Sequence, residues 1–256
     1  MLLVLSPSKT QVINGKTISK WTLPPLLQHA EELTAILRGM DEKKLGELMR
    51  ISPPLAAQTY RRFQEMSFPF TPGNSRQALL VFRGAQYTPI EIDRYSEEDF
   101  LYAQEHLCML SGLYGVLRPL DLIQPYRLEM ATKLVTGKGR NLYQFWDGLL
   151  AKTLRIFMAG HKHPVLVNLA SVEYFRAVRV RELGVPVLKI DFKEQKGDAT
   201  RVIAVHAKRA RGLMADWVLR NRIGEIEGLK QFTRAGYQFS KEMSSPWHWV
   251  FCRPGQ

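Results

Sequence analysis

The sequence predicts an α/β protein, in which helices surround a mixed β-sheet and a small helical subdomain lies near the amino terminus. Short, continuous apolar runs such as residues 2–5 are typical of buried strands. Longer segments with apolar residues three or four positions apart, such as residues 24–40, are typical of amphipathic helices. Both kinds of segment occur without a repeat or an interdomain linker, so we expect one domain over residues 1–256, with the helical subdomain at residues 22–70.

Three helices are predicted in the helical subdomain. Pro24 and Pro25 suit the first turn of a helix at residues 24–40, because proline lacks an N–H that this turn does not use. Two shorter helices are predicted at residues 42–50 and 54–64.

The turn between these two shorter helices is brief, and Arg61 and Arg62 follow it. Such a pair suggests a helix-hairpin-helix, an element that holds a DNA phosphate through the backbone amides of its hairpin. This hairpin has no glycine, however, and Pro53 and Pro54 each lack an N–H donor. An ordinary helical pair packed on the core therefore stays an open alternative.

The middle of the chain is predicted to begin with a buried strand at residues 78–82. Residues 96–99 resemble a capping box and would start a helix whose apolar face runs on to Leu110. A further amphipathic helix is predicted over residues 141–159.

The last third of the chain is rich in predicted strands, and a basic helix begins within it at residue 207. The predicted strands are residues 165–169, 186–192, 201–206, 237–240 and 247–252. Residues 194–198 would join the second and third of them as a hairpin.

One stretch, residues 110–130, is both irregular and apolar. Gly112, Gly115 and Pro119 are among the residues that interrupt regular structure there, yet the stretch is too apolar for a solvent-exposed loop. Its buried backbone must therefore be satisfied by side chains or water. Two interpretations are open: a core loop held by arginine–carboxylate pairs, or the floor of a site whose arginines face a cleft.

The charge of the chain implies an anionic partner, because the formal net charge is +12 and the isoelectric point is near 9.8. Nucleic acid, a phosphorylated ligand and an acidic surface are all compatible with it. Cys108 and Cys252 lie far apart, and no apolar run is long enough to span a membrane. The apolar start at residues 1–5 is too short for a signal peptide. We therefore expect a soluble cytoplasmic protein without disulfides.

Several basic residues are predicted to lie at strand ends. Lys9, Arg83 and Lys208 each follow a predicted strand, and open α/β sheets commonly bind ligands beyond the carboxyl ends of their strands. If these ends converge, Arg118 and Arg127 of the central stretch would complete a basic cleft. A solvated turn is the alternative for Lys9.

The predicted basic helix carries a stripe of positive charge. Lys208, Arg211 and Arg222 cluster on the face opposite its apolar residues, and Arg209 lies beside them. Within the helix only Asp216 offsets this charge, so internal salt bridges cannot account for the stripe. We interpret it as a face that contacts phosphates, with a solvated amphipathic helix as the alternative.

Catalytic and metal sites are weaker interpretations. Glu129, Glu173 and His206 could supply general acid–base chemistry beside a bound phosphate, which leaves enzymatic activity open. Ser171 has no histidine partner visible in the sequence, and the acids could simply neutralise neighbouring arginines. The other histidines lack further ligands at the spacing of a metal site. We therefore favour a binding protein over an enzyme and expect neither a metal nor a cofactor.

The irregular segment Ser111-Gly-Leu-Tyr-Gly-Val-Leu-Arg-Pro-Leu-Asp121 and the following Pro125-Tyr-Arg-Leu-Glu-Met130 resemble the signature of the bacterial YaaA family, the peroxide stress proteins. Further segments match in the same order, at residues 5–10, 48–52, 141–146, 167–171 and 207–214. The resemblance thus extends to about residue 214 and rests on many irregular motifs in register.

The resemblance implies an α/β fold of its own with a positively charged cleft, a helix-hairpin-helix in the helical subdomain and binding of duplex DNA. It also implies a role in withstanding hydrogen peroxide by limiting iron-driven oxidative damage to DNA and protein. We expect a monomer that holds double-stranded DNA through its phosphates, with little sequence preference and a strong dependence on salt. The expected phosphate contacts are Lys9, Arg50, Arg61, Arg62, Arg83, Arg118, Arg127, Lys208, Arg209 and Arg211.

Two other functions would use the same basic cleft. One is an enzyme that acts on a nucleotide or a phosphorylated small molecule, and the other is a stress-response adaptor that binds an acidic protein. Binding of duplexes of unrelated sequence without turnover would favour the DNA-binding interpretation over both.

Overall fold

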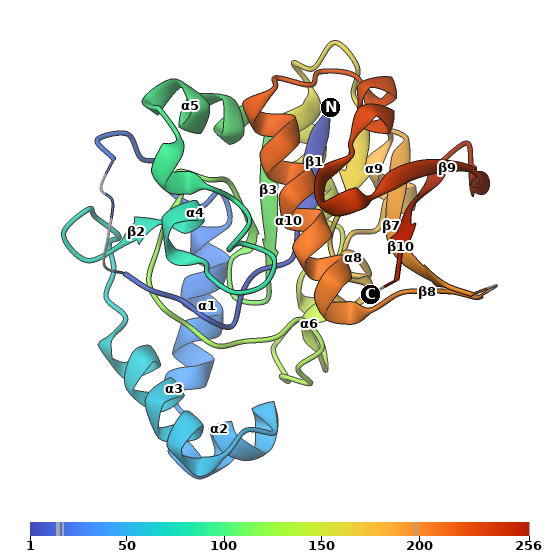
Figure 1. The fold of residues 1–256 in the computed structure, drawn as a ribbon. Coiled ribbons are helices and arrows are strands. Elements are labelled where there is room, and N and C mark those ends of the chain that lie inside the picture. Colours follow the sequence, from blue (N-terminus) through green and yellow to red (C-terminus); the bar gives the residue numbers. More distant parts are fainter. Residues whose placement is uncertain (14–15, 17, 198, 256) are drawn as a thin grey trace.

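The computed structural model describes residues 1–13, 16, 18–197 and 199–255, and it is a mixed α/β fold (Figure 1). In this described part of the chain, eight strands form one sheet in the order β4-β3-β1-β6-β7-β10-β9, with β8 paired to β7. Five of these strands run parallel: β1 (Leu2–Leu5), β3 (Leu107–Ser111), β6 (Leu166–Asn168), β7 (Val187–Lys196) and β10 (His248–Pro254). The antiparallel strands are β4 (Gly115–Leu117), β8 (Ala199–Arg201) and β9 (Gln238–Ser245). The predicted mixed α/β class is therefore confirmed.

Helices cover both faces of the sheet, as its buried central strands require. Figure 1 shows α10 (Ala204–Arg220) in front of the sheet and α8 (Val172–Phe175) and α9 (Val180–Leu183) behind it. Helix α5 (Glu97–His106) packs against α10 and against β1 and β3. Two further helices lie beside β4: α6 (Leu142–Phe145) and α7 (Leu149–Met158).

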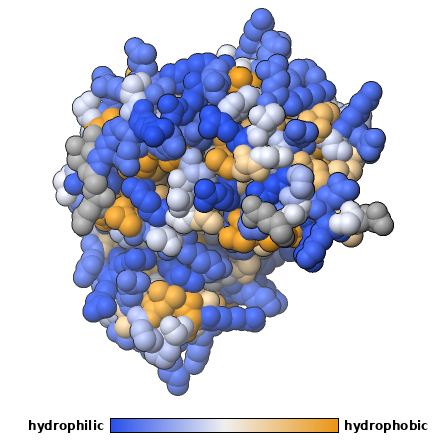
Figure 2. All heavy atoms as spheres, in the orientation of Figure 1, coloured by the Kyte–Doolittle hydropathy of each residue, from blue (hydrophilic) through white to orange (hydrophobic). Residues whose placement is uncertain are grey.

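Residues 22–70, predicted to be a helical subdomain, contain α1 (Leu27–Arg38), α2 (Glu42–Met49) and α3 (Pro53–Glu65). The three predicted helices are thus confirmed, although α1 starts only after the two prolines that were expected in its first turn. Helix α3 packs against both α1 and α2, and the pair α2–α3 projects from the body of the molecule (Figures 1 and 2). The structure shows a helical pair joined by residues 50–52, and its identity as a helix-hairpin-helix stays a prediction.

Two predictions in the middle of the chain are wrong. Residues 78–82 are not a strand: they form the short helix α4 (Ala78–Val81), and only Phe82 bridges to Gln11. The helix of residues 97–110 ends at His106, where the chain enters β3. Residues 78–82 and 107–110 are fully buried, so their apolar runs carry no period that distinguishes a helix from a strand.

Two further predictions need correction. The helix expected over residues 141–159 is divided into α6 and α7 by Gly148, whose φ of +70° lies in the left-handed region that favours glycine. The strand expected at residues 201–206 is also wrong, because β8 ends at Arg201 and α10 begins at Ala204. The hairpin of β7 and β8 is present, although Asp198 in its turn lies outside the described residues.

The strands predicted near the carboxyl terminus are confirmed and are longer than expected, as β9 and β10. The central stretch is almost wholly buried, as predicted, and contains β4 and the short β5 (Leu122–Ile123), which pairs with β2 (Arg76–Gln77). Buried Asp121 stabilises this path by accepting hydrogen bonds from the Arg118 N–H at 2.7 Å and the Thr22 hydroxyl at 2.5 Å. Burial raises the pKa of Asp121 to about 6 despite these bonds.

Gly212 permits the close packing of α10 on the loop after α4. A Cβ at this position would lie 1.9 Å from the carbonyl oxygen of Gln86. Replacing glycine by alanine within a helix ordinarily raises the free energy of unfolding by about 1 kcal/mol. At residue 212 we expect the replacement to lower it, because the helix would have to move away from the loop.

The substitution Gly212→Ala is therefore expected to lower the free energy of unfolding by about 2 kcal/mol, measured by urea denaturation. Gly137→Ala is the control, since a Cβ there meets no heavy atom within 4 Å. Equal stability of the Gly212→Ala variant and the wild type would show that this contact is not tight in solution.

Candidate functional site

Segments that follow the carboxyl ends of β1 and β6 meet at one edge of the sheet. The Ser171 N–H donates to the Ser6 hydroxyl at 2.8 Å and joins the segment after β6 to the segment after β1. The Tyr126 N–H donates to the Gln11 side-chain oxygen at 2.8 Å and brings the central stretch to the same place. The segments after β1 and β6 therefore meet at this edge. The strands expected before Arg83 and Lys208 are not formed, so the predicted convergence of their ends with that of Lys9 is not observed.

The central stretch folds back across the end of β3. The carbonyl oxygen of Leu128 lies 2.3 Å from where a Cβ of Gly112 would be, so only glycine permits this approach. The Tyr126 hydroxyl and the Ser111 hydroxyl are 2.7 Å apart, and the Trp146 indole donates to the Gly112 carbonyl at 2.9 Å. These contacts hold residues 126–130 beside Lys9.

An ion cluster results, with Glu129 at its centre. One carboxylate oxygen of Glu129 lies 2.7 Å from Lys9 Nζ and 3.2 Å from Arg127 Nη2. Arg62 of α3 is near enough to the cluster to be affected by it: burial lowers the pKa of Arg62, and repulsion by the Arg127 charge lowers it further. Lys9 and Arg127 therefore share one oxygen of the Glu129 carboxylate.

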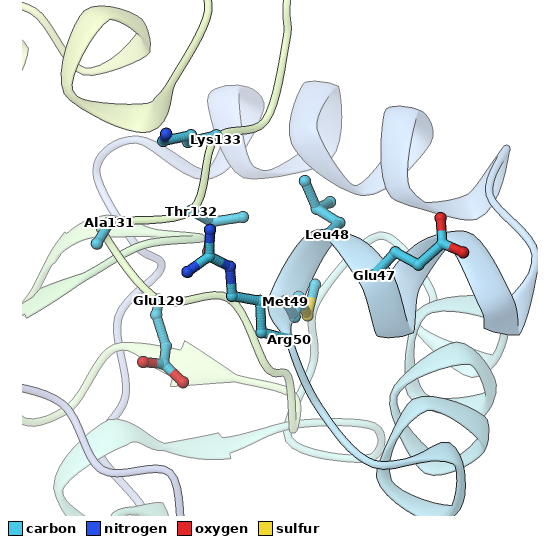
Figure 3. Close-up of a pocket in the computed structure, with 8 residues that line it drawn as sticks. All are labelled: Glu47, Leu48, Met49, Arg50, Glu129, Ala131, Thr132 and Lys133. Atoms are coloured by element: carbon cyan, nitrogen blue, oxygen red, sulfur yellow. The ribbon is translucent and has the colours of Figure 1, made fainter.

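A cavity of about 500 Å³ lies between the end of α2 and residues 129–133 (Figure 3). Arg50 ends α2 with a φ of +52°, and its guanidinium points across the cavity toward Thr132. A much smaller cavity, of about 20 Å³, is lined by Lys9, Arg127 and Tyr174 among others. Glu129 lines both cavities, so the two share a wall at this residue.

Two further residues lie at the same edge of the sheet or along the larger cavity: Glu173, which the sequence analysis predicted, and Lys133, which it did not. Glu173 lies at this edge as expected, but its carboxylate accepts the backbone N–H of Ala131 at 3.1 Å and so braces the rim. Lys133 lines the larger cavity and was missed. It lies just beyond the central stretch, in a segment that has no helical or strand period to place it.

The structure places Arg83 beside the Lys9 segment, because its backbone N–H donates to the Thr10 carbonyl at 3.0 Å. It does not follow a strand, and its guanidinium donates to the carbonyls of Leu80 and Phe82 at 2.8 and 2.9 Å. The Arg83 guanidinium, which was expected to contact phosphate, therefore caps the end of α4 instead.

Arg118 lies away from the cleft. It follows β4, which is antiparallel to β3 and leads the chain away from the carboxyl edge of the sheet. Its guanidinium lies over the ring of Phe157 in α7, 4.7 Å from the centroid. The expectation that Arg118 completes the cleft is wrong for this topological reason, whereas Arg127 is placed as expected.

The residues predicted to form the basic stripe of α10 differ in their exposure and in their partners. Lys208 and Arg209 are exposed in the second turn, because the helix begins earlier than predicted. Arg211 is half-buried, and burial lowers its pKa. Arg222 lies beyond the helix and pairs with Asp99 at 2.7 Å, so it does not extend the stripe.

Nearly the whole chain matches known proteins in sequence. The sequence profile of the family described as "Peroxide stress protein YaaA" matches residues 1–243. The chain belongs to the YaaA family. It is 47% identical to a UPF0246 protein of Acaryochloris marina over 253 residues, 99% of this chain and 100% of the relative. UPF0246 proteins of Cellvibrio japonicus and Magnetococcus marinus are each 44% identical over 254 residues, 99% of this chain and 98% and 99% of the relatives.

In this YaaA-family chain, a buried carboxylate anchors the start of α10. Glu194 of β7 accepts from His206 at 2.6 Å and from Arg253 of β10 at 2.8 Å, and the Tyr237 hydroxyl lies 3.3 Å away. Burial acts to raise the pKa of Glu194, but the hydrogen bonds from Arg253 and His206 hold it below its ordinary value. His206, a candidate for acid–base chemistry, thus serves to position the helix that carries Lys208.

Among the residues that the structure describes, no three histidine, cysteine, aspartate or glutamate side chains are grouped so that they could hold a metal ion. Within the same residues, no helix has the length and apolar character needed to cross a membrane.

The substitution Glu194→Gln is expected to lower the free energy of unfolding by about 3 kcal/mol, because it removes the buried anion that pairs with the half-buried Arg253 guanidinium. The folded-state pKa of Glu194 is lowered, so its contribution is present above the unfolded pKa of about 4.3 and is lost as the pH falls through the lower folded value. Urea denaturation across pH 3–7 should therefore show a difference in the free energy of unfolding between wild type and variant, and this difference should become smaller toward pH 3.

Glu242→Gln is the matched control for this prediction, because Glu242 is exposed on β9. Its stability should follow that of the wild type at every pH. A gap for Glu194→Gln that is constant with pH would contradict the assigned role of its charge.

Proposed function

We propose that this YaaA-family protein binds double-stranded DNA through backbone phosphates at the edge of the sheet where Lys9 and Arg127 meet. The observation that carries the proposal is the imbalance of charge there, where these two cations share the single carboxylate of Glu129. Arg50 and Lys133 add positive charge across the adjoining cavity. An anionic polymer with evenly spaced charges suits such a surface on a chain of net charge +12.

The projecting pair α2–α3 would extend the contact along the backbone. Arg61 is exposed on α3, and Arg50 lies at the turn between the helices. We propose that this pair acts as a helix-hairpin-helix and holds one stretch of backbone, while the cleft holds another. Contacts of this kind position a duplex without reading its bases, so sequence preference would be weak.

The catalytic candidates support binding more than turnover, because each is already engaged. Glu129 pairs with two cations, Glu173 accepts a backbone N–H, and His206 is bonded to Glu194. The family's description as peroxide stress proteins supports a biological role for such binding. We propose that it protects DNA during peroxide stress and helps limit iron-driven oxidative damage.

The double variant Lys9→Ala/Arg50→Ala is expected to weaken duplex binding by about tenfold or more, since two phosphate contacts are lost. Both side chains are exposed, so the fold should be unaffected. Fluorescence anisotropy with a labelled duplex over a salt series should show a log–log slope that is flatter by about two than that of the wild type.

Lys162→Ala/Arg155→Ala is the matched control, because it removes the same charge from exposed positions before β6 and on α7. Its slope should stay close to that of the wild type. Equal slopes for the two double variants would place the duplex elsewhere, and a wild type that binds no duplex at low salt would refute the proposal.

A further inference from the structure

We infer that Glu129 is the resident anion of a phosphate-binding site formed by Lys9 and Arg127, and that an incoming phosphate group displaces its carboxylate. The inference rests on the proposed function and adds an internal competitor to it. Glu129 would lower the affinity of the cleft and admit only ligands that bind these two cations better than a carboxylate does.

The position of the Glu129 carboxylate is that of a bound anion. A single oxygen accepts from two cations on different segments, Lys9 after β1 and Arg127 in the central stretch. The distances of 2.7 and 3.2 Å are those of charge-assisted hydrogen bonds, which phosphate oxygens would make with the same groups.

The carboxylate leaves the cluster incompletely neutralised. Two positive charges share one oxygen of a single carboxylate. The Arg127 side chain is 15% exposed, and its buried Nε has no hydrogen-bond partner in the described part of the chain. A phosphate group offers oxygens in several directions, so it can contact both cations through separate oxygens.

The carboxylate also has a place to go when it is displaced. Glu129 is 30% exposed and forms the wall between the small cavity at Lys9 and the cavity of about 500 Å³ at Arg50. In Figure 3 its carboxylate points away from Arg50 and Lys133. A change of rotamer would carry it into the larger cavity, where these two cations can receive it.

The Lys9–Glu129 pair contributes little to folding. Exposed ion pairs add little to stability, and the Lys9 side chain is 61% exposed. A glutamine at position 129 keeps the size of the side chain while removing its charge. The variant Glu129→Gln is therefore a clean probe of the competitor, and its fold can be checked by thermal unfolding.

We expect Glu129→Gln to bind both inorganic phosphate, measured by isothermal titration calorimetry, and a labelled duplex, measured by anisotropy, about tenfold more tightly than the wild type. Glu65→Gln is the control, because it removes one negative charge from an exposed position on α3 outside the cluster. It should change either affinity less than twofold. Adding Arg127→Gln to Glu129→Gln should abolish the gain.

The outcomes separate this inference from the proposed function. Tighter phosphate binding by Glu129→Gln, with no duplex binding by any variant, would support the inference and refute the DNA-binding function. Duplex binding by the wild type with the same or weaker binding by Glu129→Gln would overturn the inference and leave the function in place. An equal gain in affinity in Glu65→Gln would also overturn the inference, because it would show that the gain comes from the net charge and not from the position of Glu129. Absence of binding to either probe would refute both.

Discussion

The close approach of Leu128 to Gly112 is the contact on which the arrangement of the site depends. A side chain at residue 112 would overlap the Leu128 carbonyl, so glycine is what lets the central stretch return across the end of β3. The return brings Arg127 and Glu129 to Lys9, which follows a different strand. The tyrosine and tryptophan hydrogen bonds at Ser111 and Gly112 then fix the path of the backbone.

Many basic residues of this protein form ion pairs with acidic residues, and those that lack a full share of negative charge mark the site. Arg222 is paired with Asp99, Arg220 with Glu91 and Arg253 with Glu194. These pairs connect separate elements and serve to hold α10 and β10 in place. The residues around Glu129 differ, because there the cations outnumber the anion and lie along cavities rather than within the core.

The helical pair α2–α3 matters to the site chiefly through its position. It projects from the body and places Arg50 opposite residues 131–133, so the cleft has one wall from the sheet edge and another from the helices (Figures 1 and 3). Burial and the nearby charge of Arg127 lower the pKa of Arg62, which belongs to the same pair. A binding surface built from two such walls can contact separated points along one extended anionic ligand.

The sequence by itself determined the class of fold, the periodic helices, most strands and the excess of positive charge, because these depend on local patterns of apolar and charged residues. Only the tertiary structure decided that residues 78–81 are helical, that Arg118 faces Phe157 and that Arg222 is bound to Asp99. A fully apolar run has no period that would distinguish a helix from a strand. The partner of a charge, likewise, is set by segments distant in sequence, which meet only when the chain is folded.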